Sequence, residues 1–323
     1  MIISKTPFRI SFCGGGTDLK EYYSKKQGSV VSTAINKYVY VMVNGLFEKN
    51  RIVVKHTRTE NVNDVKKIRH PIIREALKLV GISGGVEITS MGDIPSETGM
   101  GSSSAFTVGL LNALHAYLGG RKTPQALAEE ACKVEIDFLK EPIGKQDQYI
   151  SSYGGFRHTV FNPDETVNSG AITIPEHTKK ELENNLLLFY TGITRKARDI
   201  LSGQKKETKG KMEFLDKMRD ISLELKGCLV RKDITRFGEL LHQNWEYKKK
   251  LTSGITNPSI ERHYNLALEA GALGGKILGA GGGGFLLFYV KKENQENVRE
   301  ALKNLREMDF SFESEGSKIV YRD

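Results

Sequence analysis

Short apolar segments rich in β-branched and aromatic residues dominate the first ninety residues of the chain. They lie at Ile2–Cys13, Val30–Thr33, Tyr38–Asn44, Arg51–His56 and Gly85–Ser90. Their lengths and their Val, Ile and Tyr content predict β-strands. The three middle segments follow one another closely, which favours a β-meander.

Apolar residues at helical spacing alternate with these strands. They predict helices over Leu19–Lys25, over His70–Val80, from Ser103 to Gly119, and after Thr123–Pro124, where threonine can cap and proline can occupy the first turn. The last of these helices has one apolar stripe, formed by Leu127, Ala131, Val134 and Phe138.

The pattern changes around residues 170–180. Strands are predicted at Leu186–Tyr190 and Phe285–Val290, with long charged helices between them. The first of these helices has a largely apolar face made of Leu215, Met218, Ser222, Leu225 and Leu229. The second covers Phe237–Lys250, and the third begins at Asn257–Pro258. Since no Pro- or Ser-rich linker separates the halves, we expect two closely packed domains, 1–180 and 181–323, with a boundary near Pro175–Asn185.

The composition is that of an ordinary globular protein, with 39% hydrophobic and 27% charged residues. Lys and Arg number 48 against 39 Asp and Glu, a net charge of +9. Because no dense basic tract with interleaved aromatic residues accompanies this excess, it favours an anionic small molecule over nucleic acid. The longest basic run, Lys248–Lys250, is interpreted as a solvated helix face.

The cysteines Cys13, Cys132 and Cys228 are widely spaced and form no CxxC motif, which argues against a disulfide framework or a structural zinc site. The first residues lack the charged and apolar regions of a signal peptide, and no apolar run reaches membrane-spanning length. We therefore expect a cytoplasmic protein without a membrane partner. The sequence leaves the oligomeric state open, a homodimer included.

The segment Asp93–Ala116 combines a glycine–serine loop with the start of an apolar helix. Exposed backbone N–H groups and the positive end of a helix dipole together form an anion site. Three consecutive serines between helix-compatible residues favour phosphate, whereas the alternative is a flexible turn with a serine N-cap.

Three carboxylates are candidates for chemistry, each with a plainer alternative. Asp18, after three glycines, can accept hydrogen bonds from hydroxyl groups or can cap the following helix. Glu135 lies beside the apolar stripe and can point inward or into solvent. Asp147, between two glutamines, can be catalytic or a turn residue.

A last glycine cluster, KILGAGGGGFLLFYV, occupies Lys276–Val290. It formally contains GxGxxG, but its glycines lead into a strand, whereas a dinucleotide fingerprint opens a helix. The chain has no GxxxxGK[ST] P-loop either. The cluster is therefore either a structural turn or a second backbone surface pressed against a ligand.

Four blocks resemble those of the GHMP kinases, the family of galactokinase, homoserine kinase and mevalonate kinase. They are PFRISFCGGGTD at Pro7–Asp18, IPSETGMGSSSA at Ile94–Ala105, GKQDQ at Gly144–Gln148, and KILGAGGGGF at Lys276–Phe285. The blocks stand in the family's order and span nearly the whole chain. The resemblance implies an α+β fold of two domains, with a nucleotide site in the groove between them that uses no P-loop.

The resemblance also implies roles for individual residues. Asp147 and Arg9 match the catalytic positions, and Ser103 and Glu135 match the positions that help to hold Mg²⁺. The nucleotide phosphates of ATP would be bound by Gly99, Met100, Gly101, Ser102, Ser103 and Ser104. The substrate would be bound by Gly15, Gly16, Thr17, Asp18, Lys145 and Gly282.

The substrate is suggested by departures from the family pattern. Galactokinases carry Glu-His where this chain has Gly15 and Gly16, and the missing acid in a basic protein suits a phosphorylated sugar. The blocks look most like the branch that phosphorylates D-glycero-D-manno-heptose 7-phosphate at its anomeric hydroxyl, for nucleotide-activated heptose and surface polysaccharide. Lys145, Arg195 and Arg198 are candidates for holding the existing phosphate, although for each residue taken alone an ordinary surface charge is the commoner case.

Two other functions stay open at this point. One is a sugar 1-kinase of the fucokinase or galactokinase kind, and the other is a non-catalytic sugar or nucleotide sensor. Retention of Arg9, Ser103, Glu135 and Asp147 together argues against the sensor, because binding alone does not need the full set.

Overall fold

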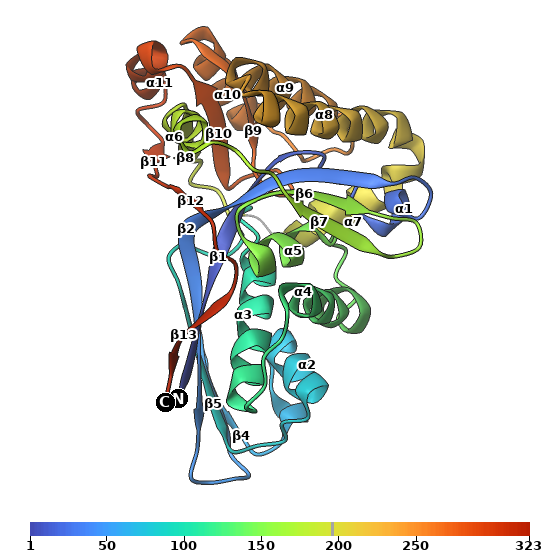
Figure 1. The fold of residues 1–323 in the computed structure, drawn as a ribbon, viewed down its shortest axis with the longest axis vertical. Coiled ribbons are helices and arrows are strands. Elements are labelled where there is room, and N and C mark those ends of the chain that lie inside the picture. The colour runs from blue at the N-terminus through green and yellow to red at the C-terminus, as the bar shows by residue number, and fades with distance from the viewer. Residues whose placement is uncertain (195–196) are drawn as a thin grey trace.

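The computed structural model describes residues 1–194 and 197–323 (Figure 1). Two β-sheets organise the described residues. The larger sheet runs in the order β13-β1-β2-β5-β3-β4, with β6 and β12 also paired to β2, and β7 paired to β6. Its strands are β1 (Ile2–Cys13), β2 (Gly28–Gly45), β3 (Ile52–Lys55), β4 (Thr59–Val62), β5 (Val86–Gly92), β6 (Phe156–Phe161), β7 (Val167–Ala171), β12 (Phe312–Glu313) and β13 (Lys318–Arg322).

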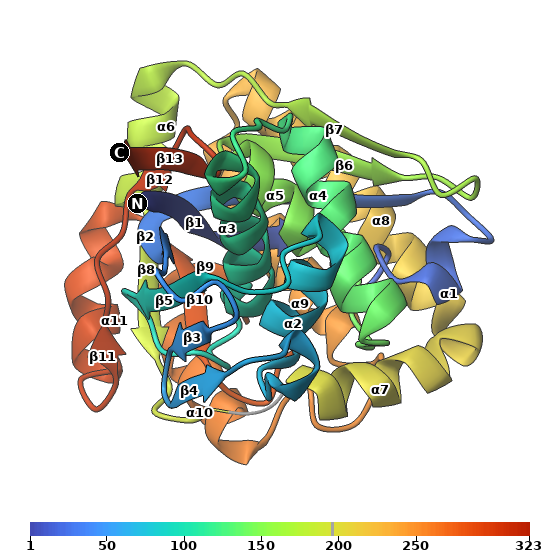
Figure 2. The ribbon, with the colours of Figure 1, turned by 90° about the horizontal axis from the view of Figure 1, so that it is seen from below.

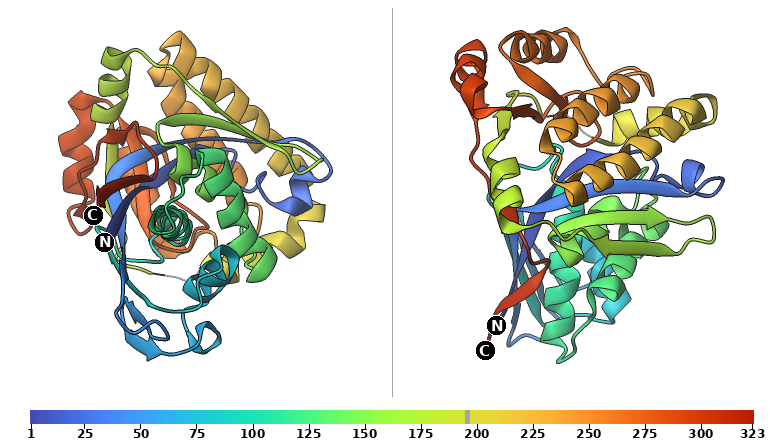
Figure 3. Two further views of the ribbon diagram at one scale, coloured as in Figure 1. Left: turned by 60° about the horizontal axis from the view of Figure 1, so that its bottom comes forward. Right: turned by 45° about the horizontal axis from the view of Figure 1, so that its top comes forward.

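Helices of the first half cover one face of this sheet (Figures 1 and 3). The central helix of the layer is α3, which packs against β1 and β2 (Figure 2). The helices in and around the layer are α1 (Lys20–Tyr23), η1 (Val65–Lys67), α2 (Pro71–Val80), α3 (Ser102–Tyr117), α4 (Pro124–Cys132), η2 (Lys133–Phe138) and α5 (Gln146–Tyr153).

The smaller sheet has the order β11-β8-β10-β9 and lies in the upper part of Figure 1. Its strands are β8 (Leu186–Tyr190), β9 (Ala272–Ile277), β10 (Phe285–Val290) and β11 (Arg306–Glu307). The helices of this half are α6 (Glu176–Asn184), α7 (Ala197–Glu207), η3 (Thr208–Lys211), α8 (Met212–Arg231), α9 (Ile234–Lys248), α10 (Pro258–Glu269), η4 (Lys292–Asn294) and α11 (Gln295–Ala301).

A shared hydrophobic core joins the two halves. Phe8, Ile10 and Phe12 of β1 are fully buried in one cluster with side chains of α8, α9 and β10, Leu225 and Leu287 among them. The last residues of β1 therefore reach from the larger sheet into the boundary with the second half. Side chains of β1 that point away from this cluster therefore lie next to both halves of the chain.

The α+β fold predicted from the family resemblance is confirmed, and most predicted elements are present. The meander is wrong. Val30–Thr33 and Tyr38–Asn44 belong to one long strand, β2, because the intervening Ala34 and Ile35 are buried and pair with β1. β3 then pairs in parallel with β5 rather than with β2.

The two ends of the chain lie side by side (Figure 1). β13 pairs antiparallel with β1, and the Asp323 amide donates to the Met1 carbonyl at 3.0 Å. The last strands thus return to the larger sheet, which is built mostly from the first half. The division into 1–180 and 181–323 remains a prediction.

Candidate active site

A cavity of about 380 Å³ lies where the two halves meet. It is lined by the end of β1 and the loop after it, the loop before α3, the starts of α3 and α5, and η2. From the second half, α7, the end of α9 and the glycine turn between β9 and β10 complete the lining. Most of the predicted site residues line this one cavity.

Arg9 and Asp147 form an ion pair at the cavity wall. Arg9 donates to both carboxylate oxygens of Asp147, from Nε at 2.7 Å and from Nη2 at 2.6 Å. Arg9 is buried, whereas the Asp147 side chain is 22% exposed toward the cavity that it lines. Asp147 lies in the first turn of α5, so the interpretation of this residue as a turn aspartate does not hold.

The loop before α3 presents free backbone amides. Gly101, not a serine, is the N-cap, and no side chain in the described part of the chain caps the helix. The first amide to find a backbone acceptor here is that of Ala105, bonded to the Gly101 carbonyl. The N–H groups of Ser102, Ser103 and Ser104 are thus available at the positive end of the helix, and the alternative of a serine cap is wrong.

The loop is fixed in place by its neighbours. Arg9 Nη1 donates to the Gly99 carbonyl at 2.6 Å, and the Arg9 amide donates to the Met100 carbonyl at 3.3 Å. On the other side, a Cβ on Gly99 would lie 2.5 Å from the Leu278 carbonyl oxygen, and one on Gly279 would lie 2.5 Å from Gly99 Cα. The glycine turn is therefore structural, since it packs backbone-to-backbone on the loop. It also lines the cavity, and its contact with a ligand stays a prediction.

Ser103 and Glu135 meet at the start of α3. Ser103 Oγ donates to Glu135 Oε1 at 2.6 Å, and Gln148 Nε2 donates to Glu135 Oε2 at 2.7 Å. Glu135 lies in η2, a π-helical turn that continues α4 and adds one residue per turn, a distortion often found at functional sites. Burial raises the pKa of Glu135 to about 7, against the lowering effect of these hydrogen bonds.

These two side chains suit a magnesium ion. Hydroxyl and carboxylate oxygens are the ligands that Mg²⁺ prefers, and the ion usually takes only one or two carboxylates together with water and phosphate oxygens. A bound cation would also relieve the burial of the Glu135 charge. Within residues 1–194 and 197–323, no three His, Cys, Asp or Glu side chains gather in a way that would hold a metal ion on their own.

Asp18 is buried at the cavity wall and is held there by backbone amides. Its Oδ1 accepts from the Gly16 amide at 2.8 Å, and its Oδ2 accepts from the Gln146 amide at 3.3 Å. Burial, together with the nearby Asp147, raises the pKa of Asp18, and the two amide hydrogen bonds oppose the rise. Asp18 is not the N-cap of α1, a position taken by Leu19.

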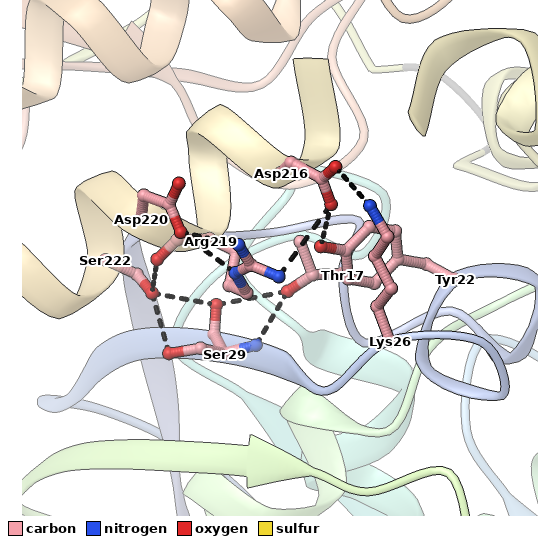
Figure 4. Close-up of polar contacts among 8 residues, drawn as sticks. All are labelled: Thr17, Tyr22, Lys26, Ser29, Asp216, Arg219, Asp220 and Ser222. Atoms are coloured by element: carbon pink, nitrogen blue, oxygen red, sulfur yellow. Dashed lines mark hydrogen bonds and ion pairs between the residues drawn. The ribbon is translucent and has the colours of Figure 1, made fainter. Parts of the chain in front are cut away.

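A polar network fixes the loop that carries Asp18 against α8 (Figure 4). Thr17 Oγ1 donates to the Gly14 carbonyl at 2.8 Å and accepts from the Ser29 amide at 2.9 Å. Ser222 of α8 donates to Ser29 Oγ at 2.7 Å, and Asp216 of α8 accepts from Tyr22 at 2.7 Å. The second half of the chain therefore helps to position a loop of the first half.

Four predicted site residues do not line the cavity. Met100 and Gly282 are buried in the backbone around it, and the Thr17 side chain belongs to the network just described. Lys145 forms an ion pair with Glu165 at 2.6 Å instead. Of the candidates for a phosphate ligand, Arg198 lines the cavity, and Arg195 lies outside the described residues.

Two lysines that line the cavity were not among the site residues predicted from the sequence. Lys276 is buried and donates to the carbonyls of Ser11 and Phe12 at 2.6 and 2.8 Å. Lys248 is 5% exposed and donates to the Gly279 carbonyl, so the interpretation of Lys248–Lys250 as a solvated face is wrong for its first member. The helical spacing of Phe237, Leu241, Asn244 and Lys248 on the buried face of α9 was the available signal.

The fold is that of a kinase with two packed halves, and the cavity that holds most of the predicted site residues lies between them. The model of the GHMP kinases N-terminal domain matches residues 64–155, and that of the GHMP kinases C-terminal domain matches residues 225–306. The chain belongs to the GHMP kinase family, whose members use ATP as co-substrate, and it is a phosphotransferase with an alcohol group as acceptor.

Individual relatives agree with this family. The chain is 31% identical to a D-glycero-alpha-D-manno-heptose 7-phosphate kinase of Campylobacter jejuni, over 98% of each chain. It is 28% identical to the L-fucokinase/L-fucose-1-P guanylyltransferase of Bacteroides fragilis, over 93% of this chain and 35% of that protein. A solved D-glycero-D-manno-heptose 1-phosphate kinase of Bacteroides thetaiotaomicron superposes with a TM-score of 0.83 at 23% identity, over 100% of each chain.

Among the residues that the structure describes, no helix combines the length and the apolar character needed to cross a membrane.

Proposed function

We propose that this chain transfers the γ-phosphoryl group of ATP, with Mg²⁺, to the anomeric C1 hydroxyl of D-glycero-D-manno-heptose 7-phosphate. The product would be the 1,7-bisphosphate, a step toward nucleotide-activated heptose for surface polysaccharide. The main support for phosphoryl transfer is the Arg9–Asp147 pair. Its carboxylate lines the same cavity as the first residues of α3. The relative from Campylobacter jejuni supports the choice of sugar.

Asp147 has the geometry to handle the proton of the attacking hydroxyl. Its carboxylate is held by Arg9 in one orientation, and its exposed part faces the cavity. A positioned carboxylate that orients or deprotonates a hydroxyl contributes about 10²- to 10⁴-fold to a rate. Arg9 also adds a fixed positive charge beside the loop that would hold the transferring phosphoryl group.

The α3 amides, Ser103 and Glu135 would serve the nucleotide. The amides would donate to phosphate oxygens, and Ser103 and Glu135 would hold the Mg²⁺ ion. A bound Mg²⁺ ion supplies neutralisation of the negative charge on the phosphate oxygens. Asp18 would accept hydrogen bonds from sugar hydroxyls.

The glycines at positions 15 and 16 suit a substrate other than galactose. Gly16 has a φ of +102°, which L side chains rarely adopt, and a Cβ there would lie 2.4 Å from Gln204 Nε2, so the histidine of galactokinases would be strained at this position. The loss of an acid also removes a charge that would repel a phosphorylated sugar.

A panel of sugars tests this function. The release of ADP is measured with D-glycero-D-manno-heptose 7-phosphate, the free heptose, L-fucose and D-galactose under the same conditions. We expect the highest kcat/KM for the 7-phosphate. Equal turnover of the free heptose would contradict the proposed substrate, and preferential turnover of fucose or galactose would place the enzyme with the other sugar 1-kinases.

A further inference from the structure

The positively charged side chains that line the cavity differ in how many of their N–H donors already have an acceptor. Within the described residues, four line the cavity: Arg9, Arg198, Lys248 and Lys276. Arg9 is bonded to Asp147 and Gly99, and Lys276 to two main-chain carbonyls. Arg198 is paired with Glu141, and its side chain is 62% exposed. These three therefore have protein acceptors or bulk water to satisfy them.

Lys248 is the exception. It is 5% exposed, and its Nζ donates to one acceptor, the Gly279 carbonyl. No carboxylate among the described residues forms an ion pair with it, so two of its three N–H donors have no protein acceptor there. A buried cation with no ion-pair contact is costly. Burial, followed by the charges of Lys276 and Arg9, lowers the pKa of Lys248 well below its usual value, against the opposite effect of the nearby Asp18 and Asp147 carboxylates.

The position of Lys248 on α9 indicates which anion it would meet. One turn earlier on the same face of α9, Asn244 accepts from the Gly14 amide at 3.1 Å, at the start of the loop that carries Asp18. Lys248 itself contacts Gly279 of the glycine turn. Lys248 thus lies between the loop that carries Asp18, the proposed sugar ligand, and the glycine turn, which packs on Gly99 of the loop before α3. In the proposed function the α3 amides and Arg9 serve the transferring phosphoryl group, which leaves Lys248 for a phosphate on the acceptor.

We propose that Lys248 binds the phosphate group that the acceptor sugar carries before the reaction, and thereby selects phosphorylated over free sugars. This inference rests on the proposed function and names a residue that the sequence left unassigned. A monoester phosphate supplies two negative charges and several acceptor oxygens. It would satisfy the free N–H donors of Lys248 and offset the cost of its buried charge.

The test compares Lys248→Met with the unchanged enzyme. Methionine keeps the length and apolar character of the side chain but removes its charge and its donors. The measured quantity is the ratio of kcat/KM for heptose 7-phosphate to kcat/KM for the free heptose. We expect this ratio to fall by about 30-fold or more, because a buried charge-assisted contact is lost only with the phosphorylated sugar.

Lys250→Met is the matched control, since Lys250 is exposed and lies two residues along the same chain segment. We expect it to leave the ratio unchanged. An equal loss with both sugars in Lys248→Met would overturn the proposal, because it would mean that Lys248 acts on the transferring phosphoryl group or on the fold. An unchanged ratio would overturn it as well.

Thermal unfolding supplies a readout that does not need turnover. Because Lys248→Met removes an unpaired buried charge, we expect the ligand-free variant to be at least as stable as the original, and to lose most of the stabilisation by heptose 7-phosphate. If Lys248→Met does not fold, Lys248→Gln, which keeps a donor for the Gly279 carbonyl, is measured in the same way.

The failure of the proposed function can be told apart from the failure of this inference. If the original enzyme does not use heptose 7-phosphate, the proposed substrate falls. The variant is then examined with ADP-saturated protein and inorganic phosphate as the probe. Phosphate stabilisation that is lost in Lys248→Met and kept in Lys250→Met would support the phosphate site, whereas equal stabilisation of both variants would overturn it.

Discussion

Arg9 donates two hydrogen bonds to the carboxylate of Asp147, at 2.7 and 2.6 Å, across 138 residues of sequence. The third donor of the same guanidinium, Nη1, bonds the Gly99 carbonyl at 2.6 Å. One buried side chain on β1 therefore fixes both the carboxylate and the loop that ends in the free amides of α3. Loss of the Arg9 side chain is therefore expected to disturb the carboxylate and the loop together.

Asp147→Asn is expected to reduce kcat by about a hundredfold or more, because an amide cannot take the hydroxyl proton. The amide has nearly the shape of the carboxylate, so ATP and sugar affinities should change little. Single-turnover rates and equilibrium binding measure the two effects separately. Asp164→Asn, in an exposed turn, is the control. Unchanged turnover in Asp147→Asn would show that another group handles the proton.

Glu135→Gln is expected to raise the Mg²⁺ concentration needed for half-maximal rate by at least about tenfold, a loss seen even for residues that only support a metal ligand. The neutral amide would still accept from Ser103, so the fold should be kept. Titration of Mg²⁺ at saturating ATP measures the effect, with the exposed Glu129→Gln on α4 as the control. An unaltered Mg²⁺ dependence would exclude Glu135 as a ligand.

Gly99→Ala is expected to weaken ATP binding by about tenfold or more and to destabilise the protein by roughly 1–3 kcal/mol. Gly99 has a φ of +83°, and its new Cβ would lie 2.5 Å from a main-chain oxygen that cannot move aside easily. ATP titration and chemical denaturation measure the two effects. Gly210→Ala, where nothing lies within 4 Å, should change neither. Normal ATP affinity in Gly99→Ala would mean that the contact with the glycine turn does not shape the proposed ATP site.

His158 is expected to make the protein sensitive to mild acid. Burial, aided by Lys226, lowers the pKa of His158 to about 4, against 6.5 for the free side chain. The unfolded chain therefore takes up a proton below pH 6.5 that the folded chain does not accept until about pH 4. The stabilisation is complete above pH 6.5 and is lost as the pH falls, by about 2 kcal/mol at pH 5.

His158→Gln tests this acid effect, because glutamine can still bond Ser29, which His158 Nε2 contacts at 2.8 Å. Chemical denaturation at pH 7.5 and pH 5.0 gives the loss of stability for each protein. The variant should lose about 2 kcal/mol less than the original over this interval. The same loss in both proteins would show that His158 is not a source of the acid sensitivity.

The sequence predicted best those elements that short local patterns of residues determine. The strand Ile2–Cys13, the loop before α3 and the helix from Asn257–Pro258 follow from local patterns of apolar, glycine and capping residues. The family resemblance then assigned roles to Arg9, Ser103, Glu135 and Asp147, and the structure brings these four to one cavity. Their individual roles remain predictions.

What the sequence could not give depends on contacts between distant segments. The strand β2 is continuous because β1, β5, β6 and β12 all pair with it, and no local pattern reports such pairing. The π-helical turn that holds Glu135 reads locally as ordinary helix. Lys248 and Lys276 look like surface charges until the packing of the second half against the Gly14–Asp18 loop buries them.

Identification of the reaction product by ³¹P NMR tests the proposed function most directly. The protein is incubated with ATP, Mg²⁺ and D-glycero-D-manno-heptose 7-phosphate. The account predicts a second sugar phosphorus signal, coupled to the anomeric proton, that grows in step with ADP while the 7-phosphate signal remains. ADP without that anomeric signal, or a new phosphate on another hydroxyl, would contradict it.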